Sequence, residues 1–127
     1  MNFPADLRYT SEHEWIKMID DTTALVGITD FAQGELGDIV YVEIETQGED
    51  VVENGIFGTI EAVKTVSDLF LPLSGEIIEF NDDLESSPDT VNGDPYGKGW
   101  MVKVKFSDAS EMEDLLSSED YKALIGA

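Results

Sequence analysis

Alternation of apolar and polar side chains predicts that most of this chain forms β-strands. The alternation is clearest in YVEIE at residues 41–45 and in WMVKVKF at residues 100–106. A period of two places one set of side chains on a buried face and the other in water. Turn-forming Gly, Asn and Asp residues separate seven predicted strands, at 14–19, 23–28, 38–44, 57–63, 65–71, 75–80 and 100–106. Short strands in this number favour a sandwich or a flattened barrel.

One short helix is predicted inside the β-pattern. In TDFAQGELGD, Asp30 and Gln33 have capping-box spacing, and Gly37 can end the helix. In contrast, residues 81–99 show no periodicity and contain many turn formers. We therefore expect a solvated loop there.

The C-terminal segment, about 110–126, is also predicted to be helical. Ser110 is followed three residues later by Glu113, which is a second capping box, and Ser118 can cap a further helix that ends at Gly126. The apolar side chains of that last helix recur at helical spacing and are expected to pack on the sheets: Tyr121, Leu124 and Ile125.

The composition is that of a globular protein dominated by acidic side chains. The 127 residues, 42% of them hydrophobic, suit one compact domain. The formal net charge of -21 repels nucleic acid and anionic membranes and favours encounter with basic protein surfaces. With no cysteine and one histidine, neither a disulfide framework nor a structural zinc site is expected. We expect a cytoplasmic protein, because the N-terminus lacks a secretory pattern and no apolar run approaches a membrane span. We also expect a monomer.

Lys64 is isolated in the sequence. It is the only basic residue between Lys17 and Lys98, an interval that holds nineteen acidic residues. It lies where two predicted strands must reverse, in a turn that contains no Gly, Pro or Asn. An enzyme that acylates one lysine benefits from such exposure and isolation, so Lys64 is predicted to be an attachment lysine on a protruding hairpin.

The segment GTIEAVKTVSDLFLPLSGEIIEFN, residues 58–81, resembles the lipoyl-attachment segment of the glycine cleavage system H protein family. The resemblance continues in SEHEW, in VGITDFAQGELGDIVYVE and in VNGDPYGKGWMVKV, so it covers almost the whole chain. Biotinyl domains typically place the modified lysine between two methionines. The neighbours here are Val63 and Thr65, which disfavours biotin.

The resemblance implies a mainly β fold, a barrel-sandwich hybrid of two small antiparallel sheets that forms a single lipoyl-carrier domain over residues 1–127. Lys64 would hold lipoic acid as an amide. The implied function is a non-catalytic carrier that takes the aminomethyl group of glycine from the P protein (glycine decarboxylase) to the T protein (aminomethyltransferase). Dihydrolipoamide dehydrogenase and a lipoate-attaching enzyme are the other implied partners.

Glu14 and Asp68 match family positions near the cleft that shelters the loaded arm, so they are candidate contacts for its cationic amine. Glu35 occupies a position where some members carry a histidine, and no role is assigned to it. Trp15, which follows Glu14, is expected to wall an apolar cleft for the lipoyl chain. His13 is expected to be a packing residue beside Trp15.

Two other functions use the same residues. A lipoyl relay protein, which donates lipoyl groups to other carrier domains, would also need Lys64. An acidic interaction module would leave Lys64 unmodified. An independent enzymatic activity has little support, because the chain has one histidine and no glycine-rich run followed by Lys-Ser or Lys-Thr.

Overall fold

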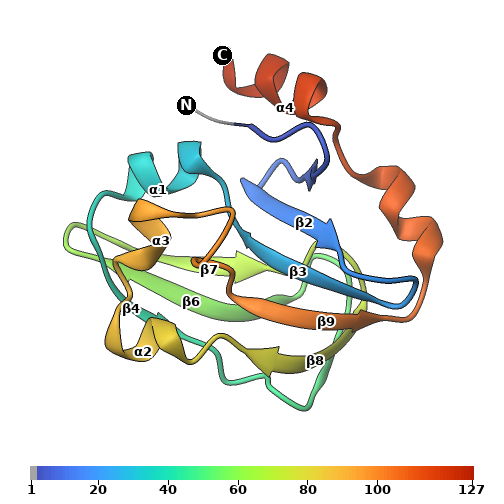
Figure 1. Cartoon of the computed structure of the whole chain (residues 1–127), viewed down its shortest axis with the longest axis horizontal. Coiled ribbons are helices and arrows are strands. Elements are labelled where there is room, and N and C mark those ends of the chain that lie inside the picture. The colour runs from blue at the N-terminus through green and yellow to red at the C-terminus, as the bar shows by residue number, and fades with distance from the viewer. Residues whose placement is uncertain (1–2) are drawn as a thin grey trace.

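The computed structural model describes residues 3–127 and consists mainly of two antiparallel sheets with short helices at their margins (Figure 1). The larger sheet has the strand order β1-β2-β3-β9-β8-β5, and its strands are Arg8–Tyr9, Glu14–Met18, Thr23–Ile28, Val102–Phe106, Gly75–Phe80 and Asp50–Val51. The smaller sheet has the order β4-β6-β7, with strands Ile39–Glu43, Ile56–Ala62 and Val66–Phe70. The predicted fold class is confirmed.

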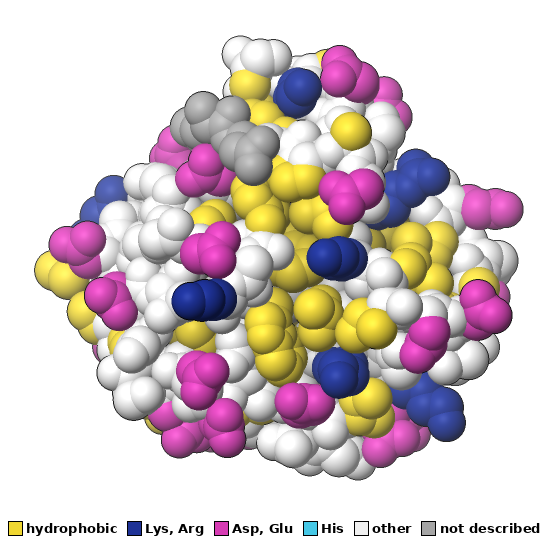
Figure 2. Space-filling model, in the orientation of Figure 1, with side chains coloured by type: hydrophobic (Ala, Val, Ile, Leu, Met, Phe, Trp, Pro, Cys, Tyr) yellow, Lys and Arg dark blue, Asp and Glu magenta, His cyan; other side chains and the backbone are white. Residues whose placement is uncertain are grey.

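The register of the larger sheet explains the alternation in the sequence. Val26 of β3 pairs with Ile16 of β2 and Val102 of β9, and all three side chains are buried. One residue away, Leu25 pairs with Lys17 and Lys103, and this row lies on the outer face of the sheet. Figure 2 shows hydrophobic side chains gathered over β2, β3 and β9 with basic side chains among them. The inner face joins the core between the sheets, which supplies most of the apolar burial.

The predicted strand boundaries agree closely with those observed. Residues 23–28 and 75–80 match β3 and β8, and four other strands differ by one residue at one or both ends. The last strand begins two residues later than predicted, at Val102. Strands β1 and β5 were missed because two residues are too few to show a period.

The predicted short internal helix is present as α1 at Asp30–Leu36, but its cap differs. Thr29 is the N-cap residue, and its hydroxyl accepts a hydrogen bond from the backbone N–H of Ala32. Asp30 instead accepts a hydrogen bond from the Gln33 side chain within the first turn. Gly37 ends the helix at a φ of 81°, as its position suggested.

The solvated loop predicted for residues 81–99 is wrong in part. The segment contains two single-turn helices, α2 at Asp83–Ser86 and α3 at Thr90–Gly93. Each buries one apolar side chain completely, Leu84 in α2 and Val91 in α3. One apolar residue per turn gives no periodicity that sequence analysis can detect.

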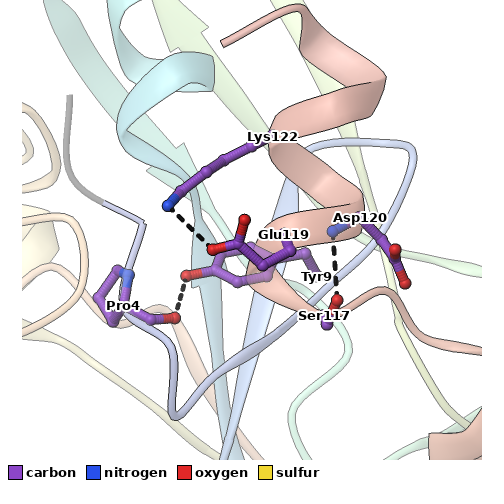
Figure 3. A network of polar contacts seen from close by, with 6 residues as sticks. All are labelled: Pro4, Tyr9, Ser117, Glu119, Asp120 and Lys122. Carbon is purple, nitrogen blue, oxygen red and sulfur yellow. Dashed lines mark hydrogen bonds and ion pairs between the residues drawn. The ribbon is translucent and has the colours of Figure 1, made fainter.

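The C-terminal helices begin elsewhere than predicted. The first is a 3₁₀ helix, η1, at Ala109–Asp114, and it is capped by Asp108 rather than Ser110. The second, α4 at Ser118–Ile125, is capped by the side chain of Ser117, one residue before the predicted cap (Figure 3). It ends at Gly126 as predicted.

Helix α4 packs beside the N-terminal segment (Figure 1). Tyr121 is fully buried there and stacks on Tyr9 with ring centroids 4.9 Å apart. Ile125 packs against the same aromatic cluster, but Leu124 is 54% exposed, so the predicted apolar stripe is only partly buried. None of the helices in residues 3–127 is long and apolar enough to cross a membrane.

Candidate functional site

Lys64 lies at the tip of the β6–β7 hairpin, which is drawn in green at one end of the molecule in Figure 1. The hairpin closes through the backbone N–H of Ala62, which donates to the carbonyl of Thr65 at 2.8 Å. The N–H of Val63 donates to the carbonyl of Asp38 at 3.1 Å, and this contact ties the tip to the start of β4. Lys64 and both flanking residues are exposed. The tip is therefore anchored at its base and accessible at its lysine.

The lysine side chain extends toward the C-terminal end of α1. A Cβ atom on Gly37 would lie 3.7 Å from the Cε of Lys64. Gly37 adopts a positive φ to end the helix, a conformation that other residues rarely tolerate. The terminus of α1 and the hairpin tip thus meet beside the lysine.

A cleft of about 390 Å³ lies between α1, β7 and the segment leading into β2. Its apolar lining consists of Ile28, Phe31, Ala32, Leu36, Ile60 and Leu69. Its polar lining consists of Glu12, His13, Glu14, Glu35, Ser67 and Asp68. The apolar groups come from both sheets and from α1, so the cleft can accept an aliphatic chain along its walls and a polar group at its rim.

Glu14 is the buried carboxyl group of the cleft, at 2% exposure. One carboxyl oxygen accepts a hydrogen bond from the backbone N–H of Phe70 at 2.8 Å, and the other accepts one from the Thr10 hydroxyl at 3.2 Å. Burial raises the pKa of Glu14 to about 8, although both hydrogen bonds lower it. Near neutral pH this burial therefore favours the protonated carboxyl group.

Asp68 and Glu35 line the same cleft but are exposed. Asp68 comes from β7 and Glu35 from the last turn of α1, so they lie on the two elements that flank the cleft. The structure thus places Glu14, Asp68 and Glu35 around one cavity, with Glu14 the only buried member of the three.

The predicted role of Trp15 is wrong. Its side chain is fully buried and lies outside the lining of the cleft, and its indole N–H donates to the carbonyl of Pro95 at 3.0 Å. Its ring packs against Tyr96, whereas the His13 ring packs against Phe31 and Tyr121. The expected packing role of His13 is therefore seen, but its ring partners among the described residues do not include Trp15.

Sequence analysis missed two residues that line the cleft, Phe31, which forms an aromatic wall, and His13. Phe31 and Leu36 lie five residues apart in α1, and the shortness of that helix hid its apolar face. His13 lines the cleft at a φ of 69°, a backbone conformation that sequence patterns do not reveal. Within residues 3–127, no group of three or more His, Asp or Glu side chains could hold a metal ion.

Known proteins resemble this chain over nearly its full length. A family model described as Glycine cleavage H-protein matches residues 7–127. The glycine cleavage system H protein of Bacteroides thetaiotaomicron is 60% identical over 125 residues, which is 98% of each chain. The protein of the same name from Chlorobium phaeobacteroides is 56% identical over 128 residues, with full coverage of both.

A solved structure agrees with these matches. The crystal structure of a glycine cleavage system H protein from Mycobacterium marinum has a TM-score of 0.87 and 37% identity, covering 98% of this chain and 99% of that one. The family model, the two relatives at 60% and 56% identity, and the solved structure all indicate the same family. The chain therefore belongs to the glycine cleavage H-protein family.

Proposed function

We propose that the chain carries a lipoyl group as an amide on the Nζ atom of Lys64. In this function it shuttles the aminomethyl group of glycine from the P protein, glycine decarboxylase, to the T protein, aminomethyltransferase. The observation that carries the proposal is the cleft that contains the buried carboxyl group of Glu14 and reaches Leu36, the neighbour of Gly37, beside which the Lys64 side chain lies.

The residues present fit a lipoyl group. The lysine is exposed at a hairpin tip, where an attaching enzyme can reach it. Asp68 follows Lys64 by four residues, which span at most about 13 Å when the chain is fully extended. A lysine side chain extended by an eight-carbon acyl group covers a similar distance. The apolar side chains of α1 and β6 can then pack on the acyl chain.

The carboxyl groups of the cleft suit a cationic amine at the end of the arm. When attached, the lipoyl group supplies a disulfide that takes up the aminomethyl group. An ammonium near Glu14 favours the ionised carboxylate and offsets its burial, so the amine and Glu14 stabilise each other's charge. Asp68 supplies a second carboxyl group at the exposed rim. Together they would hold the amine while the carrier moves between enzymes.

The chain itself acts as a carrier and not as an enzyme in this proposal. Residues 1–127 form the single lipoyl-carrier domain, and the arm keeps its cargo at high effective concentration near each active site. Dihydrolipoamide dehydrogenase reoxidises the arm, and a lipoate-attaching enzyme installs it. The net charge of -21 favours encounter with basic surfaces of these partners. We place this monomeric carrier in the cytoplasm.

Intact mass spectrometry tests the attachment site directly. Incubation of the protein with lipoate–protein ligase, lipoate and ATP should add the mass of one lipoyl group, and Lys64→Arg should abolish the addition. Arginine keeps the positive charge but is not acylated by this chemistry, so it separates chemistry from electrostatics. Equal modification of Lys64→Arg would contradict the proposal.

A further inference from the structure

His13 occupies an unusual position at the cleft. Its φ of 69° lies in the left-handed region, which is uncommon for residues other than glycine. Backbone hydrogen bonds hold it there: its N–H donates to the carbonyl of Thr10, and its carbonyl accepts from the N–H of Thr29. Its side chain lines the cleft that also contains Glu14. A strained residue held in place beside a cavity is a candidate functional residue.

A chain of hydrogen bonds fixes the tautomer of His13. The backbone N–H of Ala32 donates to the Thr29 hydroxyl at 3.1 Å, and the hydroxyl groups of Thr29 and Tyr121 are 2.8 Å apart. The Tyr121 hydroxyl lies 2.9 Å from the Nδ1 atom of His13. Thr29 is fully buried, so its own proton needs an acceptor, and among the described residues the Tyr121 oxygen is the one in reach.

The direction of these hydrogen bonds follows because the Thr29 proton needs an acceptor. Thr29 donates to Tyr121, and the Tyr121 proton is then directed to Nδ1 of His13, which must accept it. A neutral His13 consequently carries its proton on Nε2. Among residues 3–127 the imidazole of His13, which lines the cleft, thus has one donor, Nε2–H, without a hydrogen-bond acceptor.

We propose that the Nε2–H of His13 donates a hydrogen bond to an acceptor atom of the arm seated in the cleft, and that Tyr121 of α4 is the positioning residue that holds this tautomer. The inference rests on the proposed function, because it requires an acylated Lys64. The acceptor is either the amide oxygen of the arm or one of its sulfur atoms, since both can accept from an N–H donor.

The packing of α4 explains why Tyr121 can hold the imidazole. The Tyr121 ring stacks on Tyr9 with an interplanar angle of 11° and meets the edge of Phe3 at 5.7 Å. The Tyr9 hydroxyl donates to the carbonyl of Pro4 at 2.7 Å, which ties the N-terminal segment beneath α4 (Figure 3). The hydroxyl of Tyr121 is therefore fixed by a rigid aromatic cluster rather than by a mobile terminus.

Nitrogen-15 NMR of the His13 ring tests the positioning role without any lipoyl group. The unloaded protein should show the Nε2-protonated tautomer, and Tyr121→Phe should lose that preference by about fivefold, equivalent to one net hydrogen bond. Tyr9→Phe is the matched control, because it removes a buried tyrosine hydroxyl from the same cluster without touching His13. An Nδ1-protonated ring in the unloaded protein, or an unchanged ring in Tyr121→Phe, would overturn the inference and leave the proposed function intact.

Loading of Lys64 tests the contact with the arm. Lipoylation should slow solvent exchange of the His13 Nε2–H about fivefold, as one added hydrogen bond does. Octanoylation supplies the amide oxygen without sulfur, so the same slowing with octanoyl assigns the amide oxygen, and slowing with lipoyl alone assigns sulfur. Unchanged exchange in both forms would refute the contact.

A variant of His13 gives a second measurement. His13→Asn removes the imidazole while retaining a residue that tolerates positive φ, so the backbone is preserved. The variant should accept the lipoyl group normally but release the seated arm more readily, seen as greater solvent accessibility of a spin label placed on the arm; unchanged accessibility would overturn the contact. Failure of Lys64 to accept the group in the wild-type protein would instead count against the proposed function.

Discussion

The carboxyl group of Glu14, on β2 of the larger sheet, accepts a hydrogen bond from the backbone N–H of Phe70 on β7 of the smaller sheet, at 2.8 Å. Strand β7 is an edge strand, and this bond satisfies one of its free donors. The same carboxyl group lines the cleft. Glu14 thus joins the two sheets and supplies a titratable group to the candidate site.

Stability should depend on pH through Glu14. Its pKa is about 8 in the folded protein and near 4.5 in the unfolded chain, so the folded state binds the extra proton between these values. The stabilisation is complete below about pH 4.5 and is lost as pH rises to about 8, by up to about 5 kcal/mol. Chemical denaturation should show that the unfolding free energy of the wild type falls relative to that of Glu14→Gln as pH rises across this range.

Glutamine is the matched substitution because it mimics the protonated acid. Its carbonyl can still accept from Phe70, so the link between the sheets is kept. A constant difference between the two proteins from pH 4.5 to 8 would show that Glu14 is ionised throughout. Other carboxyl groups contribute equally to both proteins and cancel.

The lifetime of the loaded arm should depend on the carboxyl groups of the cleft. Glu14→Gln cannot become anionic, so release of ammonia and formaldehyde from loaded protein, without T protein or tetrahydrofolate, should be about tenfold faster. Asp68→Asn should have a smaller effect because an exposed ion pair contributes roughly 0–1 kcal/mol. Lipoylation of Lys64 should be normal in both. Lifetimes equal to wild type would remove the corresponding residue from this role.

The two glycines of the α1 region should respond oppositely to alanine. Gly37 has a φ of 81°, so Gly37→Ala should destabilise the protein by about 1 kcal/mol or more. Gly34 lies inside α1, and a Cβ atom added there would meet nothing within 4 Å, so Gly34→Ala should stabilise the protein by roughly 0.5–1 kcal/mol. Thermal unfolding of both variants measures the difference. A destabilising Gly34→Ala together with a neutral Gly37→Ala would contradict the role assigned to Gly37 at the end of α1.

Association with partner enzymes should be sensitive to salt. The net charge of -21 should accelerate encounter with basic surfaces, and ions screen this attraction within about 8–10 Å near physiological ionic strength. Stopped-flow association rates with the P and T proteins should fall steeply between low and high salt. A flat profile would show that the acidic surface does not steer docking.

The sequence by itself determined the strands and the exposed lysine. Alternation marks strands such as β3 and β9 because one face of each sheet is buried and the other is wet, a constraint that acts residue by residue. The isolation of Lys64 in an acidic stretch is likewise local information. The ends of α1 and α4 came from capping signals, and each observed cap lies one residue before the predicted one, because Thr29 and Ser117 also carry hydroxyl groups that can accept from the first turn.

The cleft and its chemistry were decided by the tertiary structure alone. Glu14 is buried where β7 of the other sheet packs against β2, and this burial raises its pKa to about 8. The wall formed by Phe31 replaced the expected Trp15, because alternation along β2 directs that indole away from the cleft, toward Pro95 and Tyr96. The hydrogen bond between Tyr121 and His13 joins opposite ends of the chain, and no local pattern encodes a contact between residues so distant in sequence.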